Sequence, residues 1–137
     1  MKWVTCENIG VDRMASAWLI KRFIDPKAEF FFIPAGTKLL PDEAVPFDIP
    51  GVRFSHHRGH CTFHALLKGY KLKDPFLARI AAIVDEADVV QEASVEAAAP
   101  GLDLACRALR RTSADDHEAV ERGRMLYEGL YAELSAE

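Results

Sequence analysis

The sequence has few cysteines, no long apolar run and no excess of basic residues. Three cysteines in 137 residues are an odd count, which argues against a disulfide framework and favours reduced core thiols or a metal ligand. No apolar stretch approaches the roughly 18 residues of a membrane span, so we expect no membrane association. The net charge of −4 argues against a nucleic-acid partner, because that affinity rests on basic residues.

Several catalytic and targeting signatures are also missing. The chain holds no phosphate-binding P-loop, no G-x-G-x-x-G, no G-x-S-x-G elbow and no C-x-x-C. Its first residues include Glu7, Asp12 and Arg13, which is unlike a signal peptide, and this predicts a cytoplasmic protein. The length suits one domain spanning residues 1–137.

The N-terminal part has the pattern of a strand, a helix and a strand. Residues 2–6 and 29–33 favour strands, and the apolar spacing from Val11 predicts a helix that ends near Ile24, before Asp25–Pro26. This length suits a βαβ unit with two parallel strands. Residues 34–51, which contain four prolines, predict a long loop, and residues 52–56 alternate as a third strand would.

The remainder predicts helices. We expect a short one from Thr62, as its cap, to Gly69, and one over 75–84 that starts at Asp74–Pro75. Two more are expected at about 101–111 and 115–134. The fold class is therefore α+β: a small N-terminal sheet of about three strands with a βαβ-like start, packed with about five helices, and a C-terminal half that is all helical.

Four of the five histidines and one cysteine lie within the nine positions 56–64. Imidazole and thiolate are common ligands of zinc, iron and copper. In a strand His56 and His57 point to opposite faces, so they would not both bind one ion. We favour His57, because the turn at Arg58–Gly59 would bring Cys61 and His64 back to it. The alternative is a solvated polar turn with Cys61 packed as a small hydrophobe.

Two acidic features accompany the histidines. Asp85 and Asp88 end the 75–84 helix, where negative charge opposes the helix dipole and favours a nearby cation. The alternative is an exposed polar helix end. Asp12 and Arg13 follow the first strand, where a helix N-terminus and a guanidinium, with Arg58, would hold an oxyanion. The alternative is a helix-terminal charge beside a salt bridge.

Long strings of this sequence resemble the C-terminal domain of the chromate-resistance ChrB family. They include residues 11–26 (V-D-R-M-A-S-A-W-L-I-K-R-F-I-D-P), residues 47–52 (F-D-I-P-G-V) leading to His57, and Cys61-Thr62-Phe63. The resemblance covers nearly the whole chain and implies a part in chromate resistance, a stress response. Relatives often carry this domain behind a regulatory N-terminal region, and we expect no DNA-binding role of that region to transfer here.

One departure from the family pattern is informative. That pattern has an acidic residue after Cys-Thr-Phe and often a histidine after Ile-Val, whereas this chain has His64 and Asp85. A histidine and a carboxylate have traded places, which would preserve a site if both face it. This favours a site of His57, His64 and Asp85, with Cys61 or Asp88 nearby. The alternative is a coincidence between two exposed positions.

Three functions remain open. The first is a sensor or enzyme core that binds zinc or iron and acts on a small oxyanion such as chromate. The second is a non-catalytic oxyanion-binding module. The third is an oligomerisation module, a homodimer formed through the C-terminal helix with Tyr127 and Tyr131.

Overall fold

The computed structural model describes residues 1–88 and 94–136. Its sheet has three parallel strands in the order β2-β1-β3. The central strand β1 (Lys2–Cys6) pairs in parallel with β2 (Glu29–Ile33), so that Trp3 lies opposite Phe30. The predicted βαβ start is confirmed. Both neighbours of β1 run parallel to it, which places the carboxyl ends of all three strands at one edge.

The third strand lies earlier in the chain than predicted. It is β3 (Ala44–Pro46), inside the proline-rich segment, and it pairs with the first half of β1. A proline is tolerated there because β3 is an edge strand. Residues 52–56 form only an isolated bridge from Phe54 to Phe47. The prediction of a strand over 52–56 is therefore wrong, and this segment is a loop that leads toward the site.

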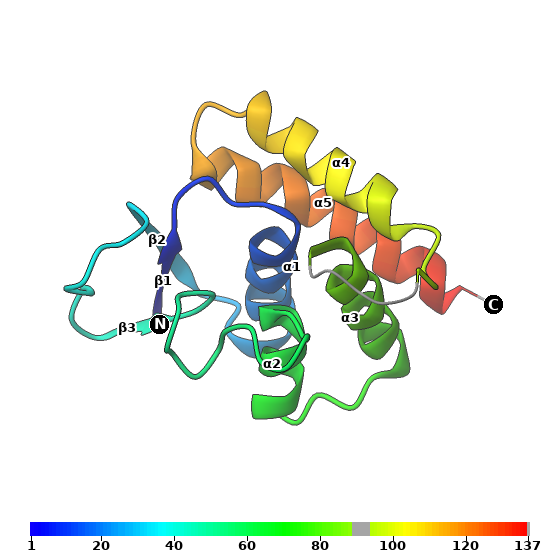
Figure 1. Cartoon of the computed structure of the whole chain (residues 1–137), viewed down its shortest axis with the longest axis horizontal. Helices are drawn as coiled ribbons and strands as arrows, with labels where there is room; N and C mark the ends of the chain where they lie inside the picture. Colours follow the sequence, from blue (N-terminus) through cyan, green and yellow to red (C-terminus); the bar gives the residue numbers. More distant parts are fainter. Residues whose placement is uncertain (89–93, 137) are drawn as a thin grey trace.

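Helix α1 (Val11–Leu19) is the centre of the molecule. It lies between the sheet and the other helices, and it continues as the π-helical turn η1 (Ile20–Ile24) (Figure 1). It contacts all four remaining α-helices, which explains why its polar residues Asp12 and Ser16 are buried along with its apolar ones. The sequence predicted a helix with one apolar face, whereas the structure has a helix buried on nearly every side.

The helices of the second half match the predicted ones closely. They are α2 (Thr62–Gly69), α3 (Pro75–Asp88), α4 (Ala99–Arg111) and α5 (Asp116–Ser135). The N-terminus of α3 is capped by Asp74, whose Oδ1 accepts the N–H groups of Phe76 and Leu77 at 2.8 and 3.4 Å. Helix α3 runs four residues past the predicted end at 84, so Asp85 and Asp88 lie within its last turn.

The tyrosines of α5 pack inside the chain. Tyr127 is fully buried, and its hydroxyl donates to the carbonyl of Val11 at 2.7 Å. Tyr131 packs against Trp18, and its hydroxyl donates to the Asp74 carboxylate. These contacts tie α5 to α1 and α3 within one copy of the chain. Among the described residues, none of the helices combines the length and apolar content that crossing a bilayer requires.

Candidate functional site

The buried carboxylate of Asp12 caps helix α2 from a different helix. Its Oδ2 accepts the N–H of Thr62 at 2.8 Å, and its Oδ1 accepts the N–H of Phe63 at 3.0 Å. These donors belong to the first turn of α2, where no carbonyl of the helix can reach them. Thr62 is the first helical residue rather than the cap, and its buried hydroxyl has no hydrogen-bond partner within the described part of the chain. The predicted Thr62 cap is wrong.

A two-residue hairpin precedes α2 and positions the histidines. His57 and His60 exchange backbone hydrogen bonds of 3.0 and 2.9 Å, with Arg58 and Gly59 between them. Both turn residues have positive φ angles, 50° and 80°, as a tight hairpin turn of this handedness requires. The predicted turn at Arg58–Gly59 is confirmed. It directs His60 toward α3.

The first group of metal-binding side chains consists of His60, His64 and Asp85. Each offers a donor atom, and these atoms lie within 4.8 Å of one another. The His60 and His64 rings are stacked, with centroids 3.9 Å apart. Asp85 binds His60 Nδ1 at 2.8 Å through Oδ2 and accepts the Cys61 N–H at 2.7 Å through Oδ1. The carboxylate thus holds the hairpin and α2 together.

The electrostatics of this group favour neutral imidazole at His64. Burial, together with the nearby His60 and Lys68, lowers the pKa of His64 below its usual value. A metal requires that neutral form. Cys61, in contrast, is fully buried, and burial beside Asp12 and Asp85 raises the pKa of its thiol far above the usual value. A thiol in this environment stays protonated and is a poor ligand.

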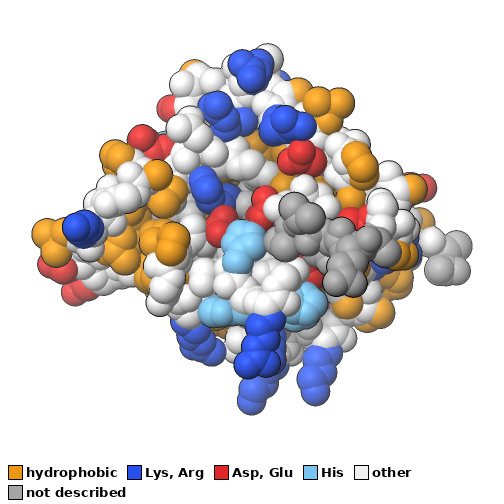
Figure 2. Space-filling model, viewed as in Figure 1, with side chains coloured by type: hydrophobic (Ala, Val, Ile, Leu, Met, Phe, Trp, Pro, Cys, Tyr) orange, Lys and Arg blue, Asp and Glu red, His pale blue; other side chains and the backbone are white. Residues whose placement is uncertain are grey.

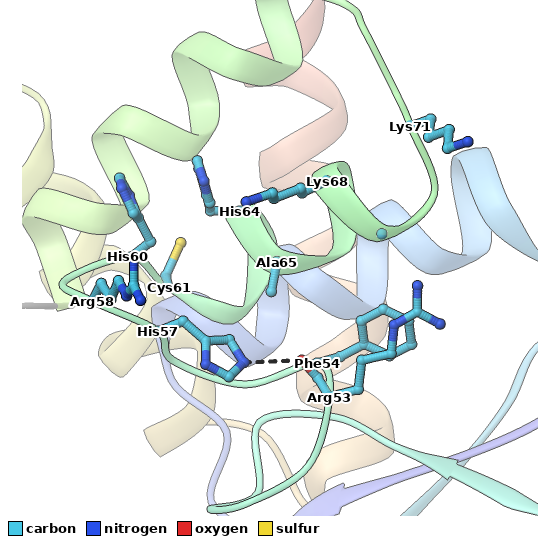
Figure 3. A pocket seen from close by; sticks show the side chains of 11 residues that line it. Arg53, Phe54, His57, Arg58, His60, Cys61, His64, Ala65, Lys68 and Lys71 are labelled. Atoms are coloured by element: carbon cyan, nitrogen blue, oxygen red, sulfur yellow. Dashed lines mark hydrogen bonds between the residues drawn. The ribbon is translucent and has the colours of Figure 1, made fainter.

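His60 and His64 also line a cavity of about 460 Å³. Figure 3 shows it from close by, with His57 and Arg58 on the hairpin side and Lys68 on α2. Four cationic residues contribute to its wall, and the described residues that line it include no acid: Arg53, Arg58, Lys68 and Lys71 are the cations. Figure 2 shows the same clustering, with the pale-blue histidines next to a group of Lys and Arg side chains. In a chain of net charge −4 this is a local concentration of positive charge.

The second group is built around His56. Its Nδ1 lies 3.0 Å from Asp48 Oδ1, and its Nε2 lies 2.6 Å from Asp88 Oδ2 and 3.6 Å from Asp12 Oδ2. Asp48 is also held by Arg13, whose Nε lies 3.0 Å from Asp48 Oδ2. Four separate segments of the chain meet here: α1, the loop after β3, the loop before the hairpin, and the end of α3.

Charges shift the ionisation of this second group. Burial, followed by the negative charges of Asp48 and Asp88, raises the pKa of Asp12 to about 7, although its two backbone hydrogen bonds act in the opposite direction. At His56 burial lowers the pKa, but the hydrogen bond to Asp88 and the charges of Asp12 and Asp48 outweigh it, so the net shift is upward. The carboxyl group of Asp12 therefore takes up a proton near neutral pH.

The structure divides the predicted metal ligands. His64 and Asp85 come together, joined by His60, whereas Asp88 lies in the second group with His56. His57 belongs to neither group among the described residues, because its Nε2 binds the carbonyl of Arg53 at 3.0 Å.

The structure also separates the predicted anion-binding residues. Arg58 lines the cavity. Asp12 caps α2, and Arg13 is bonded to Asp48 and to the carbonyls of Cys6 and Glu7. The sequence reasoning missed Asp48, His56 and His60 as site residues. His56 and His60 were visible in the histidine cluster, but nothing in the proline-rich loop distinguished Asp48.

The two residues at which this chain departs from the resemblance, His64 and Asp85, lie close together in the structure. His64 on α2 and Asp85 on α3 offer donor atoms within the 4.8 Å limit of the first group. A histidine and a carboxylate that trade places across this short distance leave the same two functional groups at the same location.

Comparison with known proteins assigns the family. The model of the ChrB C-terminal domain matches residues 3–134, nearly the whole chain. The chain belongs to the ChrB C-terminal domain family. It is 32% identical over 136 residues to the protein ChrB of Cupriavidus metallidurans. The aligned region covers 98% of this chain and 41% of that relative. The chain thus spans about two fifths of the relative's length. No solved structure matches it. The resemblance to the ChrB family read from the sequence is confirmed.

Proposed function

We propose that this ChrB-family chain is a metal-binding core that binds a small oxyanion such as chromate, as a sensor or as a metal-dependent enzyme. The observation that carries the proposal is the first group, His60, His64 and Asp85, whose two histidines line a cavity with four cationic residues in its wall. Two imidazoles and a carboxylate are a common ligand set for catalytic zinc and for non-haem iron. We therefore expect zinc or iron.

The residues around the first group suit an ion with an open coordination position. Three protein ligands leave room in the coordination sphere for water or for one oxygen of an oxyanion. Asp85 already orients His60 and holds the start of α2, so the ligands are positioned before any ion binds. The lowered pKa of His64 keeps a donor nitrogen available at neutral pH.

The cations of the cavity supply the oxyanion selectivity. A dianion that enters the cavity meets Arg58 from the hairpin and Lys68 from α2, and no carboxylate among the described lining residues opposes it. Arg13 has no part in this proposal, because it is bonded to Asp48. We thus place the oxyanion at Arg58 and Lys68.

The first test is elemental analysis of tag-free protein beside the variant His64→Ala. We expect close to one equivalent of zinc or iron in the wild type and its loss in the variant. His57→Ala is the matched control, because His57 lies in the same turn and contacts the carbonyl of Arg53 instead. Unchanged metal content in His64→Ala would contradict the site.

A second candidate is oxyanion binding without a metal. The cavity favours it because its cations would attract an anion whether or not an ion occupies the histidines. Calorimetric titration with chromate and with sulfate, before and after chelation, distinguishes the two. Binding that survives chelation supports the metal-free module, and binding that is lost supports the metal-dependent core.

A further inference from the structure

We infer that the second group is a separate divalent-cation site, in which Asp12, Asp88 and Nε2 of His56 are the ligands and Asp48 is the partner that orients His56. This site does not rest on the proposed function. Its ligands differ from those of the first group: at the start of α2, Asp12 binds the N–H groups of Thr62 and Phe63, whereas Asp85 binds that of Cys61.

The two separations measured from His56 Nε2 are compatible with a shared ion. Two ligand atoms that each lie about 2.1 Å from one ion are separated by about 3.0–3.4 Å in octahedral or tetrahedral geometry. His56 Nε2 lies 2.6 Å from Asp88 Oδ2 and 3.6 Å from Asp12 Oδ2, values that bracket this range. Small side-chain rotations at the partly exposed His56 and Asp88 would bring both separations into it.

The surroundings of His56 are those of a metal ligand. Ligating histidines usually donate their second ring N–H to a carboxylate, which fixes the tautomer and the ring orientation. Asp48 lies 3.0 Å from Nδ1 and would accept that proton, and Arg13 holds Asp48 at 3.0 Å. A series of contacts from Arg13 through Asp48 to His56 thus directs Nε2 at Asp12 and Asp88, where a bound ion would take the place of the Nε2 proton that Asp88 accepts.

The charges balance when a divalent ion is present. With an ion bound, Asp48 stays paired with Arg13, and the two negative charges of Asp12 and Asp88 face the ion beside an imidazole whose Nε2 proton the ion has displaced. A divalent cation neutralises them. Asp12 is only 2% exposed, so its charge has little access to water for compensation.

The ligand chemistry predicts a different metal preference from that of the first group. Two carboxylates and one imidazole form an oxygen-rich set that suits Mn²⁺ or Fe²⁺, whereas the first group has more nitrogen. We therefore choose Mn²⁺ as the probe. Its free ion gives an electron paramagnetic resonance signal that is lost on binding, so the bound fraction can be measured directly.

The test is a Mn²⁺ titration of the chelator-treated, tag-free chain and of five variants. We expect one ion per wild-type chain and the same affinity in His64→Ala and His57→Ala. In His56→Ala and Asp88→Asn the affinity should fall by more than tenfold. Asp48→Asn changes only the partner that orients His56, so this variant should still bind Mn²⁺, with an affinity about 10–100-fold lower than that of the wild type. Asp88→Asn preserves the side-chain shape and removes charge repulsion, so the variant should fold.

Two results would overturn the inference. One is the absence of saturable Mn²⁺ binding in the wild type. The other is binding that His64→Ala removes and His56→Ala preserves, because the ion would then lie in the cavity. A paramagnetic nuclear magnetic resonance experiment adds an independent readout: Mn²⁺ should broaden the ring protons of His56 more than those of His64. Failure of the zinc or iron proposal at His64 leaves these expectations unchanged.

Discussion

Removal of the Asp12 side chain tests how the buried carboxylate joins α1 to α2. In Asp12→Ala the N–H groups of Thr62 and Phe63 lose their acceptors in a buried setting. Each unsatisfied buried N–H costs about 1–3 kcal/mol. Part of this cost is offset, because the variant also removes a buried charge that Asp48 and Asp88 repel. We expect a net destabilisation of about 2–3 kcal/mol.

Urea unfolding in the presence of a chelator measures this loss without any contribution from bound metal. With a urea dependence of about 2 kcal/mol per molar, the unfolding midpoint should fall by about 1 M. The melting temperature should fall by about 10 °C for a chain of this size. Asp12→Asn preserves one acceptor oxygen, so its loss of unfolding free energy should be roughly half that of Asp12→Ala.

Asp88→Ala is the matched control for this prediction. It removes a carboxylate from the same group, but Asp88 contacts the partly exposed His56 rather than the helix terminus. Asp88→Ala should change the free energy of unfolding by no more than about 0.5 kcal/mol, as most surface substitutions do. If Asp12→Ala unfolds at the same urea concentration as the wild type, or a higher one, the capping argument is refuted.

Two further predictions concern the rest of the fold and the cavity. Burial raises the pKa of Asp74, but the hydrogen bonds from Tyr131 and from the N-terminus of α3 outweigh burial, so the net shift of this pKa is downward. Ionised Asp74 therefore stabilises the folded chain fully above the pKa of the unfolded carboxyl group. This stabilisation is lost as the pH falls through the lower pKa of the folded state. Tyr131→Phe should therefore flatten the decline in the unfolding midpoint between about pH 5 and pH 3, and an unchanged decline would count against this assignment. Arg13→Met should lower the unfolding free energy by about 2 kcal/mol, because it breaks charge-assisted bonds to Asp48 and to backbone carbonyls. Its oxyanion affinity in titration calorimetry should match the wild type, whereas Arg58→Ala should weaken binding several-fold, and the reverse result would restore Arg13 as the anion ligand.

Local patterns were sufficient to predict most of the elements. The apolar spacing from Val11 and the Asp25–Pro26 break placed the first helix, and Asp74–Pro75 placed the start of α3. The third strand was misplaced because proline argues against a strand in general, whereas Pro46 lies on an edge strand whose N–H is not needed. That choice depends on pairing with β1, which is more than 40 residues away in sequence.

The candidate site was harder to predict because its contacts are distant in sequence. Strand alternation predicted that His56 and His57 point to opposite faces, but residues 52–56 form no strand, and the pattern offered no way to tell which histidine meets the carboxylates. Asp48 gives no sequence signal, since its position follows from a loop conformation with a positive φ of 51°. Asp12 was read as an N-terminal helix charge or an anion-site residue, yet it caps a helix that begins 50 residues later.

The most direct test of the account is the metal content of the tag-free chain, measured beside His64→Ala and His57→Ala. We expect close to one equivalent of zinc or iron in the wild type and in His57→Ala, and its loss in His64→Ala, because His64 shares the first group with His60 and Asp85. A wild type that holds neither zinc nor iron after reconstitution, or a His64→Ala variant that retains the metal in full, would contradict it.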